Sequence, residues 1–279
     1  MSTCIIDNKG DKLFATYQAC PGSETVILLH GGPGFVEDLS VIAAKLATNF
    51  QVIQFDQRGT TRSPCGSGDY SMDAYVSDID AIAFQFMLQK FHLFGHSWGG
   101  LYAQVYAQMN PDRLLSLFLC CPGSGTGAEW KQTEKEVLQY NRSKCSTAEW
   151  IKMGINSLFG MLGSDKAYRR LFEQVMNNYN KDFVPPGDWK IDLDLVKAAP
   201  VNQTRKEIRK YPILNPFNNQ ELKITIVYGD RDIYGSSKEF VLRRYPAAKV
   251  LTIGNSGHNP WIHNPSNFLT VLGSHFGIK

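Results

Sequence analysis

The sequence predicts an α/β fold in which a mostly parallel sheet of about eight strands is flanked by helices and covered by a helical cap. Short runs of apolar, β-branched and aromatic residues alternate along the chain with segments of helical periodicity. This alternation is typical of a parallel sheet with helices on both faces. Between residues 123 and 211 it stops, and helical patterns follow one another, as expected for an inserted helical layer.

The first element is a predicted hairpin, in which residues 4–6 and 12–17 flank the turn Asn8-Lys9-Gly10. Six later apolar runs are predicted to be buried strands, at residues 26–29, 52–55, 91–94, 114–119, 224–228 and 250–253. Active residues in parallel sheets gather at the carboxyl ends of the strands. The residues that directly follow these runs are therefore the candidates for function.

Helices are predicted from apolar spacing. Between the second and third buried strands, apolar residues at 72, 75, 76, 79, 83 and 86 share one helical face, and Ser71 is a suitable N-cap. In the later stretch without a clear strand, amphipathic patterns cover residues 130–140, 149–161 and 167–179. The breaker Pro185-Pro186-Gly187 and a further helical region follow. We predict a core domain of residues 1–122 and 212–279, with residues 123–211 inserted as a cap over the carboxyl edge of the sheet.

Composition excludes several classes of protein. The net charge of +3 is small and the basic residues form no tract, so nucleic-acid binding has little support. No stretch approaches the roughly 20 apolar residues of a membrane span, and no signal segment precedes the first strand. We expect a soluble cytoplasmic protein. The six cysteines show no metal-ligand spacing, and we predict neither a metal nor a cofactor.

The most informative motif is the pentapeptide Gly95-His96-Ser97-Trp98-Gly99. It has the form G-x-S-x-G and lies between a predicted strand and a predicted helix, which is the setting of a nucleophile elbow. The turn is so tight that glycines must flank the serine. We predict that Ser97 is a catalytic nucleophile.

A nucleophilic serine needs a histidine base and an acid that orients the base. In this kind of sheet the chain order is nucleophile, acid and histidine. Asp230 and Asp232 follow the predicted strand at 224–228, and His258 follows the strand at 250–253 in a glycine-flanked loop. We predict His258 as the base and prefer Asp232 to Asp230 as the acid, because it lies past the turn and can reach inward.

Acyl transfer also needs hydrogen-bond donors for the developing oxyanion. One candidate is the backbone N–H of Trp98, directly after the nucleophile. The other is the N–H of Gly32, within the loop His30-Gly31-Gly32-Pro33-Gly34 that follows the predicted strand at 26–29.

Three segments together resemble the proline iminopeptidase group of α/β-hydrolases. They are His30-Gly31-Gly32-Pro33-Gly34, Asp56-Gln57-Arg58-Gly59 and Gly95-His96-Ser97-Trp98-Gly99-Gly100. The resemblance covers roughly residues 20–120 and 222–279. It implies an α/β-hydrolase fold with an eight-stranded sheet and a helical cap, and release of an N-terminal residue, typically proline, from peptides or amides. It also implies that Asp56 and Arg58 form an ion-paired structural corner.

The chain departs from this family where the substrate's amino group would bind. Family members often carry a glutamate five residues after the catalytic histidine, and His263 stands there instead. The predicted cap is basic, with 15 Lys/Arg against 11 Asp/Glu, although Glu134, Glu136, Glu149 or Glu173 could still bind an amino terminus. Trp261 and His263 follow the base closely and are candidate substrate-binding residues.

The sequence therefore predicts a serine hydrolase acting through an acyl-enzyme on a small-molecule or short-peptide substrate. Peptide or amide cleavage at a small N-terminal residue comes first, by resemblance, and a carboxylesterase or lactonase with the same triad comes second. A rival from another class is a non-catalytic α/β-hydrolase-fold protein that binds a small ligand beneath the cap. The sequence does not predict the acyl group or the oligomeric state.

Overall fold

A computed structural model describes residues 1–183 and 191–278 of the chain. The predicted eight-stranded, mostly parallel sheet is confirmed, with the strand order β1-β2-β5-β3-β6-β7-β9-β10. The first two strands form the predicted hairpin, and β2 pairs antiparallel with β5; every other neighbouring pair is parallel. The strand bounds are β1 Ser2–Asn8, β2 Asp11–Gln18, β3 Thr25–Leu29, β5 Gln51–Phe55, β6 Phe91–His96, β7 Leu114–Cys120, β9 Lys223–Gly229 and β10 Lys249–Ile253.

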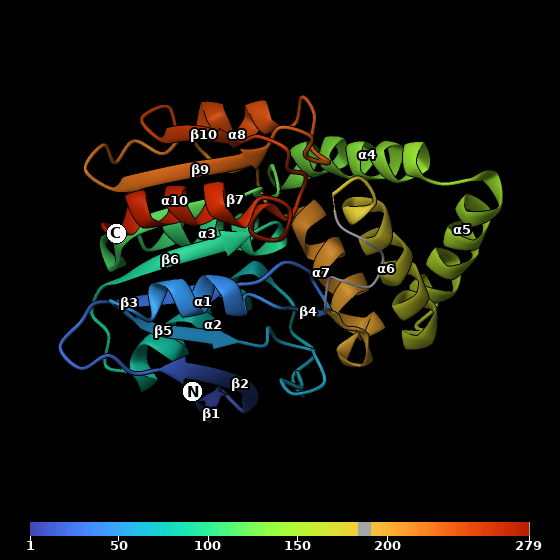
Figure 1. The fold of residues 1–279 in the computed structure, drawn as a ribbon. Coiled ribbons are helices and arrows are strands. Elements are labelled where there is room, and N and C mark those ends of the chain that lie inside the picture. Colours follow the sequence, from blue (N-terminus) through green and yellow to red (C-terminus); the bar gives the residue numbers. More distant parts are fainter. Residues whose placement is uncertain (184–190, 279) are drawn as a thin grey trace.

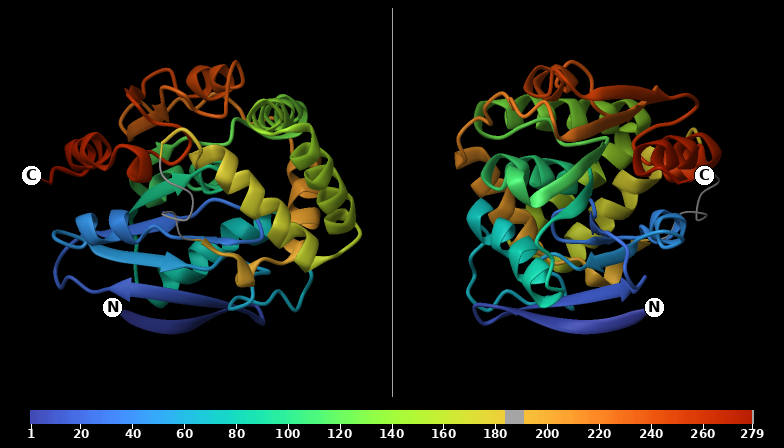
Figure 2. Two further views of the ribbon diagram at one scale, coloured as in Figure 1. Left: turned by 45° about the vertical axis from the view of Figure 1, so that its right-hand side comes forward. Right: turned by 90° about the vertical axis from the view of Figure 1, so that its left-hand side faces the viewer.

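Helices cover both faces of this sheet (Figures 1 and 2). One face carries α1 and α10, and the other carries α2, α3 and α8. Ser71 caps α2 as predicted, since its side chain accepts a hydrogen bond from the N–H of Ala74. The bounds are α1 Ser40–Leu46, α2 Met72–Gln85, α3 Trp98–Met109, α8 Lys238–Arg244, α9 Pro260–His263 and α10 Pro265–Phe276, with a short 3₁₀ helix at Pro111–Arg113.

A second group of helices lies beyond the carboxyl ends of the parallel strands (Figure 1). Their bounds are α4 Gly127–Lys144, α5 Thr147–Met161, α6 Asp165–Asn180 and α7 Ala198–Lys210, with a 3₁₀ helix at Leu193–Leu195. All four fall inside the stretch predicted to be a cap. The breaker Pro185-Pro186-Gly187 lies outside the described residues.

The inserted stretch also contains a short strand that local pattern did not predict. Strand β8, Ile191–Asp192, pairs antiparallel with β4, Val36–Glu37, which follows the glycine-rich loop after β3. This pairing joins segments more than 150 positions apart, so it cannot be predicted from local periodicity.

The sheet interior is apolar, and a buried ion-pair network lies near its antiparallel edge. Arg58 donates to Asp78 through Nε and Nη2, at 2.7 and 2.6 Å, and its Nη1 lies 3.4 Å from Asp11. Asp56 pairs instead with Arg62, with Nε 2.6 Å from Oδ2. Asp56 and Arg58 are thus both buried and ion-paired, as expected, but with different partners: Arg62, six positions along the same loop, and Asp78 of α2.

Candidate active site

The serine elbow lies between β6 and α3, where backbone conformation is under close steric control. Ser97 has φ 52° and ψ −117°, a conformation that non-glycine residues rarely adopt. A Cβ on Gly95 would lie 2.4 Å from the carbonyl oxygen of Gly99, and a Cβ on Gly99 would lie 2.3 Å from that of Leu29. Both positions therefore require glycine, as the motif predicted.

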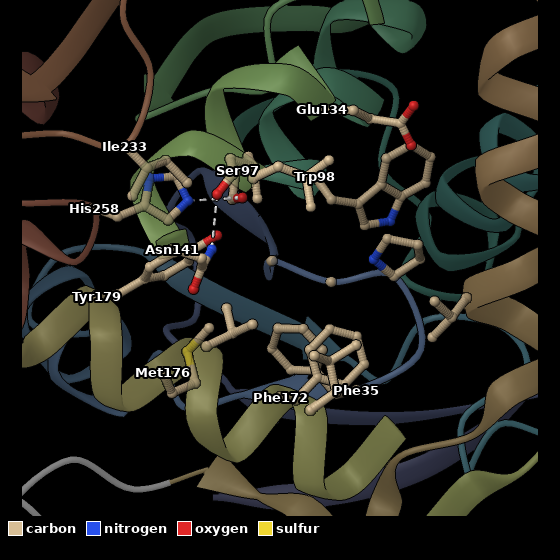
Figure 3. Close-up of a pocket in the computed structure, with 18 of the residues that line it drawn as sticks. Phe35, Ser97, Trp98, Glu134, Asn141, Phe172, Met176, Tyr179, Ile233 and His258 are labelled. Atoms are coloured by element: carbon tan, nitrogen blue, oxygen red, sulfur yellow. Dashed lines mark hydrogen bonds between the residues drawn. The ribbon is translucent and has the colours of Figure 1, made fainter. Parts of the chain in front are cut away.

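The three residues predicted as nucleophile, base and acid meet in one chain of hydrogen bonds. His258 Nε2 lies 2.9 Å from Ser97 Oγ (Figure 3), and His258 Nδ1 lies 2.8 Å from Asp232 Oδ1. The acid follows β9, the base follows β10 and the serine follows β6, so three strand ends supply the group. Asp230 faces away and accepts the N–H groups of Asn255 and Ser256, at 3.0 and 2.8 Å.

The electrostatics of this chain favour a neutral base. Burial lowers the pKa of His258 below its ordinary value, although the neighbouring Asp232 acts to raise it. Burial acts to raise the pKa of Asp232, but the charge and hydrogen bond of His258 outweigh it and the net pKa is lowered. A neutral imidazole with its proton on Nδ1 leaves Nε2 free to accept the proton of Ser97.

The two candidate oxyanion donors lie beside the nucleophile. Trp98 is the first residue of α3, so its N–H has no partner within the helix. Gly32 has φ +140°, and a Cβ there would lie 3.6 Å from the Trp98 side chain. Among the described residues no hydrogen bond uses either N–H. Both residues line the same cavity as Ser97, and both groups are available to a substrate oxygen.

The cavity has a volume of about 350 Å³ and lies between the strand ends and the second group of helices. Figure 3 shows Ser97 and His258 on one side, with Phe35, Phe172 and Met176 opposite them. Helix α6 presents a stripe of lining residues with helical spacing: Tyr168, Leu171, Phe172, Val175, Met176 and Tyr179. The wall is mostly apolar, which suits an apolar part of a substrate.

Among the described residues, two carboxylates line the cavity, and both already bind cationic or N–H groups. Glu134 accepts hydrogen bonds from Arg205 and Arg209, each with an Nη2 2.7 Å from a carboxylate oxygen. Glu37 is buried and lies against His96 and the N–H of Gly31. Of the other carboxylates proposed from the sequence, Glu136 accepts the N–H groups of residues 235 and 237, and Glu149 caps α5.

Trp261 and His263, predicted as substrate-binding residues, are not among the described residues that line the cavity. Trp261 is buried edge-on against His96, with ring centroids 4.5 Å apart. His263 accepts the N–H of Gly257 at Nδ1 and donates from Nε2 to Asn180 Oδ1, at 2.9 and 2.7 Å. It therefore joins the loop of the base to helix α6, behind the site.

Sequence reasoning missed the groups that surround the base. The His258 ring lies between the rings of Tyr179 and Tyr234, with centroids 5.3 and 5.2 Å away. Tyr234 follows the predicted acid by two positions and could have been suspected. Tyr179 lies in α6, and the periodicity of that helix does not reveal which face meets the site.

Among the described residues, the one group of possible metal ligands is Cys121, Asp232 and His258. This group includes Asp232 and His258, the proposed acid and base, which are hydrogen-bonded to each other. The prediction of a metal-free mechanism stays untested. No helix in the described parts of the chain has the length and apolarity needed to cross a membrane.

Comparisons with known proteins agree with this geometry. A family model for the alpha/beta hydrolase fold matches residues 24–142. The proline iminopeptidase of Heyndrickxia coagulans is 31% identical over 96% of each chain. The proline iminopeptidase of Lactobacillus crispatus (strain ST1) is also 31% identical, but the match covers 41% of each chain. Among solved structures, VinJ superposes with a TM-score of 0.72 at 16% identity, covering 99% of this chain and 98% of VinJ, which supports the fold alone.

Proposed function

The chain belongs to the proline iminopeptidase-like group of the alpha/beta hydrolase fold family, and from this premise we propose that it is a serine hydrolase with Ser97 as its nucleophile. The observation that supports this proposal is the continuous hydrogen-bond chain from Ser97 through His258 to the buried Asp232, at the edge of an apolar cavity. Such a chain supplies a nucleophile, a base and an orienting acid without any further group.

In the proposed reaction, Ser97 Oγ attacks the carbonyl carbon of the substrate while His258 Nε2 takes the hydroxyl proton. The carbonyl oxygen becomes an oxyanion, to which the N–H groups of Trp98 and Gly32 donate. When the tetrahedral intermediate collapses, His258 returns the proton to the leaving group and an acyl-enzyme remains. His258 then takes a proton from water, the resulting hydroxide attacks the ester carbon, and Ser97 recovers its proton as the acid leaves.

For the substrate, we propose a peptide or amide whose N-terminal residue is small and apolar, such as proline. The similarity to proline iminopeptidases over nearly the whole chain supports this class. The aromatic and aliphatic wall formed by Phe35, Phe172 and Met176 would hold the side chain of that residue.

A second candidate is a carboxylesterase or lactonase, and a specific observation favours it. A free amino terminus carries a positive charge and needs a carboxylate or several acceptors once it leaves water. Glu134 already binds two arginines, and Glu37 already binds His96 and a backbone N–H. A neutral ester or lactone would need no free carboxylate in the cavity.

One set of assays tests both candidates. Hydrolysis of proline β-naphthylamide would be measured beside its N-acetylated form, p-nitrophenyl acetate and p-nitrophenyl butyrate, with Ser97→Ala as control. Cleavage of the free-amine amide alone would support the peptidase. Cleavage of the esters with both amides untouched would support the esterase. Turnover by Ser97→Ala equal to that of the wild type would refute the covalent mechanism.

A further inference from the structure

A second buried hydrogen-bond chain lies directly behind the base and takes no part in the mechanism above. His96 Nδ1 lies 2.6 Å from Glu37 Oε2, and His96 Nε2 lies 2.9 Å from the backbone oxygen of His258. The side chains of His96 and Glu37 are 2% and 7% exposed, so both lie largely out of contact with bulk water. The His96 and His258 rings are 4.9 Å apart.

The hydrogen-bond partners of His96 indicate which of its ring nitrogens carry a proton. A backbone carbonyl oxygen and an ionised carboxylate can only accept, so both ring nitrogens of His96 must donate. The imidazole is then protonated and positively charged. Burial acts to raise the pKa of Glu37, but His96 and the Gly31 N–H outweigh it, and the net pKa lies below its ordinary value.

Two neighbouring histidines, His30 and His263, have hydrogen-bond partners that suit a neutral ring. His30 faces the carbonyl oxygen of Gly31 at Nδ1 and accepts the N–H of Gln57 at Nε2. His263 likewise has one nitrogen that accepts and one that donates. Each is satisfied as a neutral ring, and burial lowers the pKa of both, to about 3 for His263. The charged groups that face His96 are therefore Glu37 and, behind His258, Asp232.

The pair also connects the three segments that carry the chemistry. Glu37 Oε2 accepts the N–H of Gly31 at 2.8 Å, one residue before the oxyanion donor Gly32. His96 directly precedes Ser97. Through the carbonyl of His258, the same imidazole holds the backbone of the base. The buried pair of Glu37 and His96, the residue before the nucleophile, thus contacts the oxyanion loop (residues 30–34, which include Gly32) and the backbone of the base.

We propose that Glu37 and His96 form a buried carboxylate–imidazolium pair that positions the base His258 and the oxyanion loop for hydrolysis. Both line the cavity beside Ser97, but we assign them a positioning role, because they contact each other, the Gly31 N–H and the backbone of His258. The proposal rests on the proposed function, since it assigns His258 the role of base.

The first test is spectroscopic and needs no substrate. In protein labelled with ¹⁵N-histidine, both ring nitrogens of His96 should carry a proton, whereas His275, whose pKa burial lowers to about 3, should be neutral and serves as reference in the same spectrum. In Glu37→Gln, the Gly31 N–H keeps the amide oxygen in the place of Oε2, so the hydrogen bonds stay while the negative charge is lost, and His96 should no longer carry both ring protons. A neutral His96 in the wild-type protein would overturn the ion pair.

The second test measures how fast a fluorophosphonate probe labels Ser97, because labelling depends on the nucleophile, the base and the oxyanion donors together. Glu37→Ala should slow labelling about 100-fold, the scale of a displacement near 1 Å in an active site. Glu37→Gln keeps the shape and should recover part of the rate. Asp11→Asn is the matched control, since Asp11 is also buried, accepts a backbone N–H and lies beside an arginine, Arg58, remote from Ser97.

The outcomes separate this proposal from the proposed function. Wild-type labelling with an unchanged rate in Glu37→Ala would overturn the positioning role and leave the serine hydrolase intact. Failure of the wild-type protein to label at Ser97 would refute the proposed function, while the NMR spectrum would still report on the pair. If Glu37→Ala does not fold, Glu37→Gln and the wild-type spectrum still decide the question.

Discussion

Replacing Asp232 with asparagine tests the proposed triad through the protons on His258. The carboxylate is fully buried, and its Oδ1 accepts the Nδ1–H of His258 at 2.8 Å. Among the described residues its Oδ2 has no hydrogen-bond partner. An asparagine that placed its NH₂ group at the Oδ2 position would bury two donors without an acceptor, which is costly. The amide should therefore turn its nitrogen toward His258.

The consequence is a change of tautomer. When the introduced amide donates to Nδ1, the His258 proton moves to Nε2, which then donates to Ser97 and cannot take its proton. In a serine triad this loss of the base is worth about 10⁴ in kcat, or about 5 kcal/mol of transition-state stabilisation. We expect kcat of Asp232→Asn to fall by about that factor, with KM nearly unchanged because the residue does not line the cavity.

The assay is hydrolysis of whichever substrate the wild-type enzyme cleaves, and Asp230→Asn is the matched control. Asp230 is two residues away and holds the backbone of residues 255 and 256, not the imidazole. In Asp230→Asn, kcat should fall by less than about tenfold, the effect of a slightly displaced loop. Equal losses in the two variants, or a small loss in Asp232→Asn, would refute the assignment of the acid.

Three further predictions concern pH and stability. Because burial lowers the pKa of His258, the acid limb of kcat/KM should have its midpoint below about 6.5; a midpoint above that value would show that Asp232 outweighs burial. Buried His275 has a pKa of about 3 when folded, whereas the unfolded chain binds this proton near pH 6.5. Lowering the pH to 5 should therefore cost about 2 kcal/mol of unfolding free energy through this residue. In urea titrations, the unfolding free energy of His275→Gln should therefore fall by about 2 kcal/mol less than that of the wild type when the pH is lowered to 5. The same pH dependence in both proteins would contradict the lowered pKa of His275. Finally, Gly99→Ala would place a Cβ 2.3 and 2.5 Å from two backbone oxygens and should lower the unfolding free energy by more than about 3 kcal/mol, whereas Gly154→Ala meets no atom within 4 Å and should raise it by up to about 1 kcal/mol. Similar melting temperatures for the two glycine variants would refute this steric argument.

The parts of the site that the sequence predicted are those fixed by local backbone chemistry. The elbow needs glycines around Ser97 because of contacts within a few residues and with β3, and those glycines are visible in the chain. The proposed acid and base could be placed because each follows an apolar strand, and parallel strands end at one edge of a sheet. The same reasoning separated Asp232 from Asp230, since the turn after β9 sets which side chain points inward.

The parts that could not be predicted depend on how distant segments meet. Glu37 belongs to the two-residue strand β4, and its partner His96 is 59 positions away. Tyr179 reaches the base from α6, and nothing in the periodicity of that helix gives its rotation relative to the sheet. The signal for Glu37 was present in part, as an acidic residue seven positions after His30 in a loop that approaches the elbow.

His263 illustrates how one side chain can change the demands on the cap. At this position the sequence carries a histidine in place of the glutamate that is frequent in the family it resembles. His263 instead donates to Asn180 Oδ1, which also accepts from Asn259, and its ring stacks on Phe183 with centroids 4.1 Å apart. His263 thus connects α6 to the loop that carries His258, and it contributes no negative charge to the cavity. If the enzyme binds an amino terminus, the described residues offer Glu134, for which the substrate would compete with Arg205 and Arg209, and Oε1 of Glu37, since the Gly31 N–H and His96 both contact Oε2.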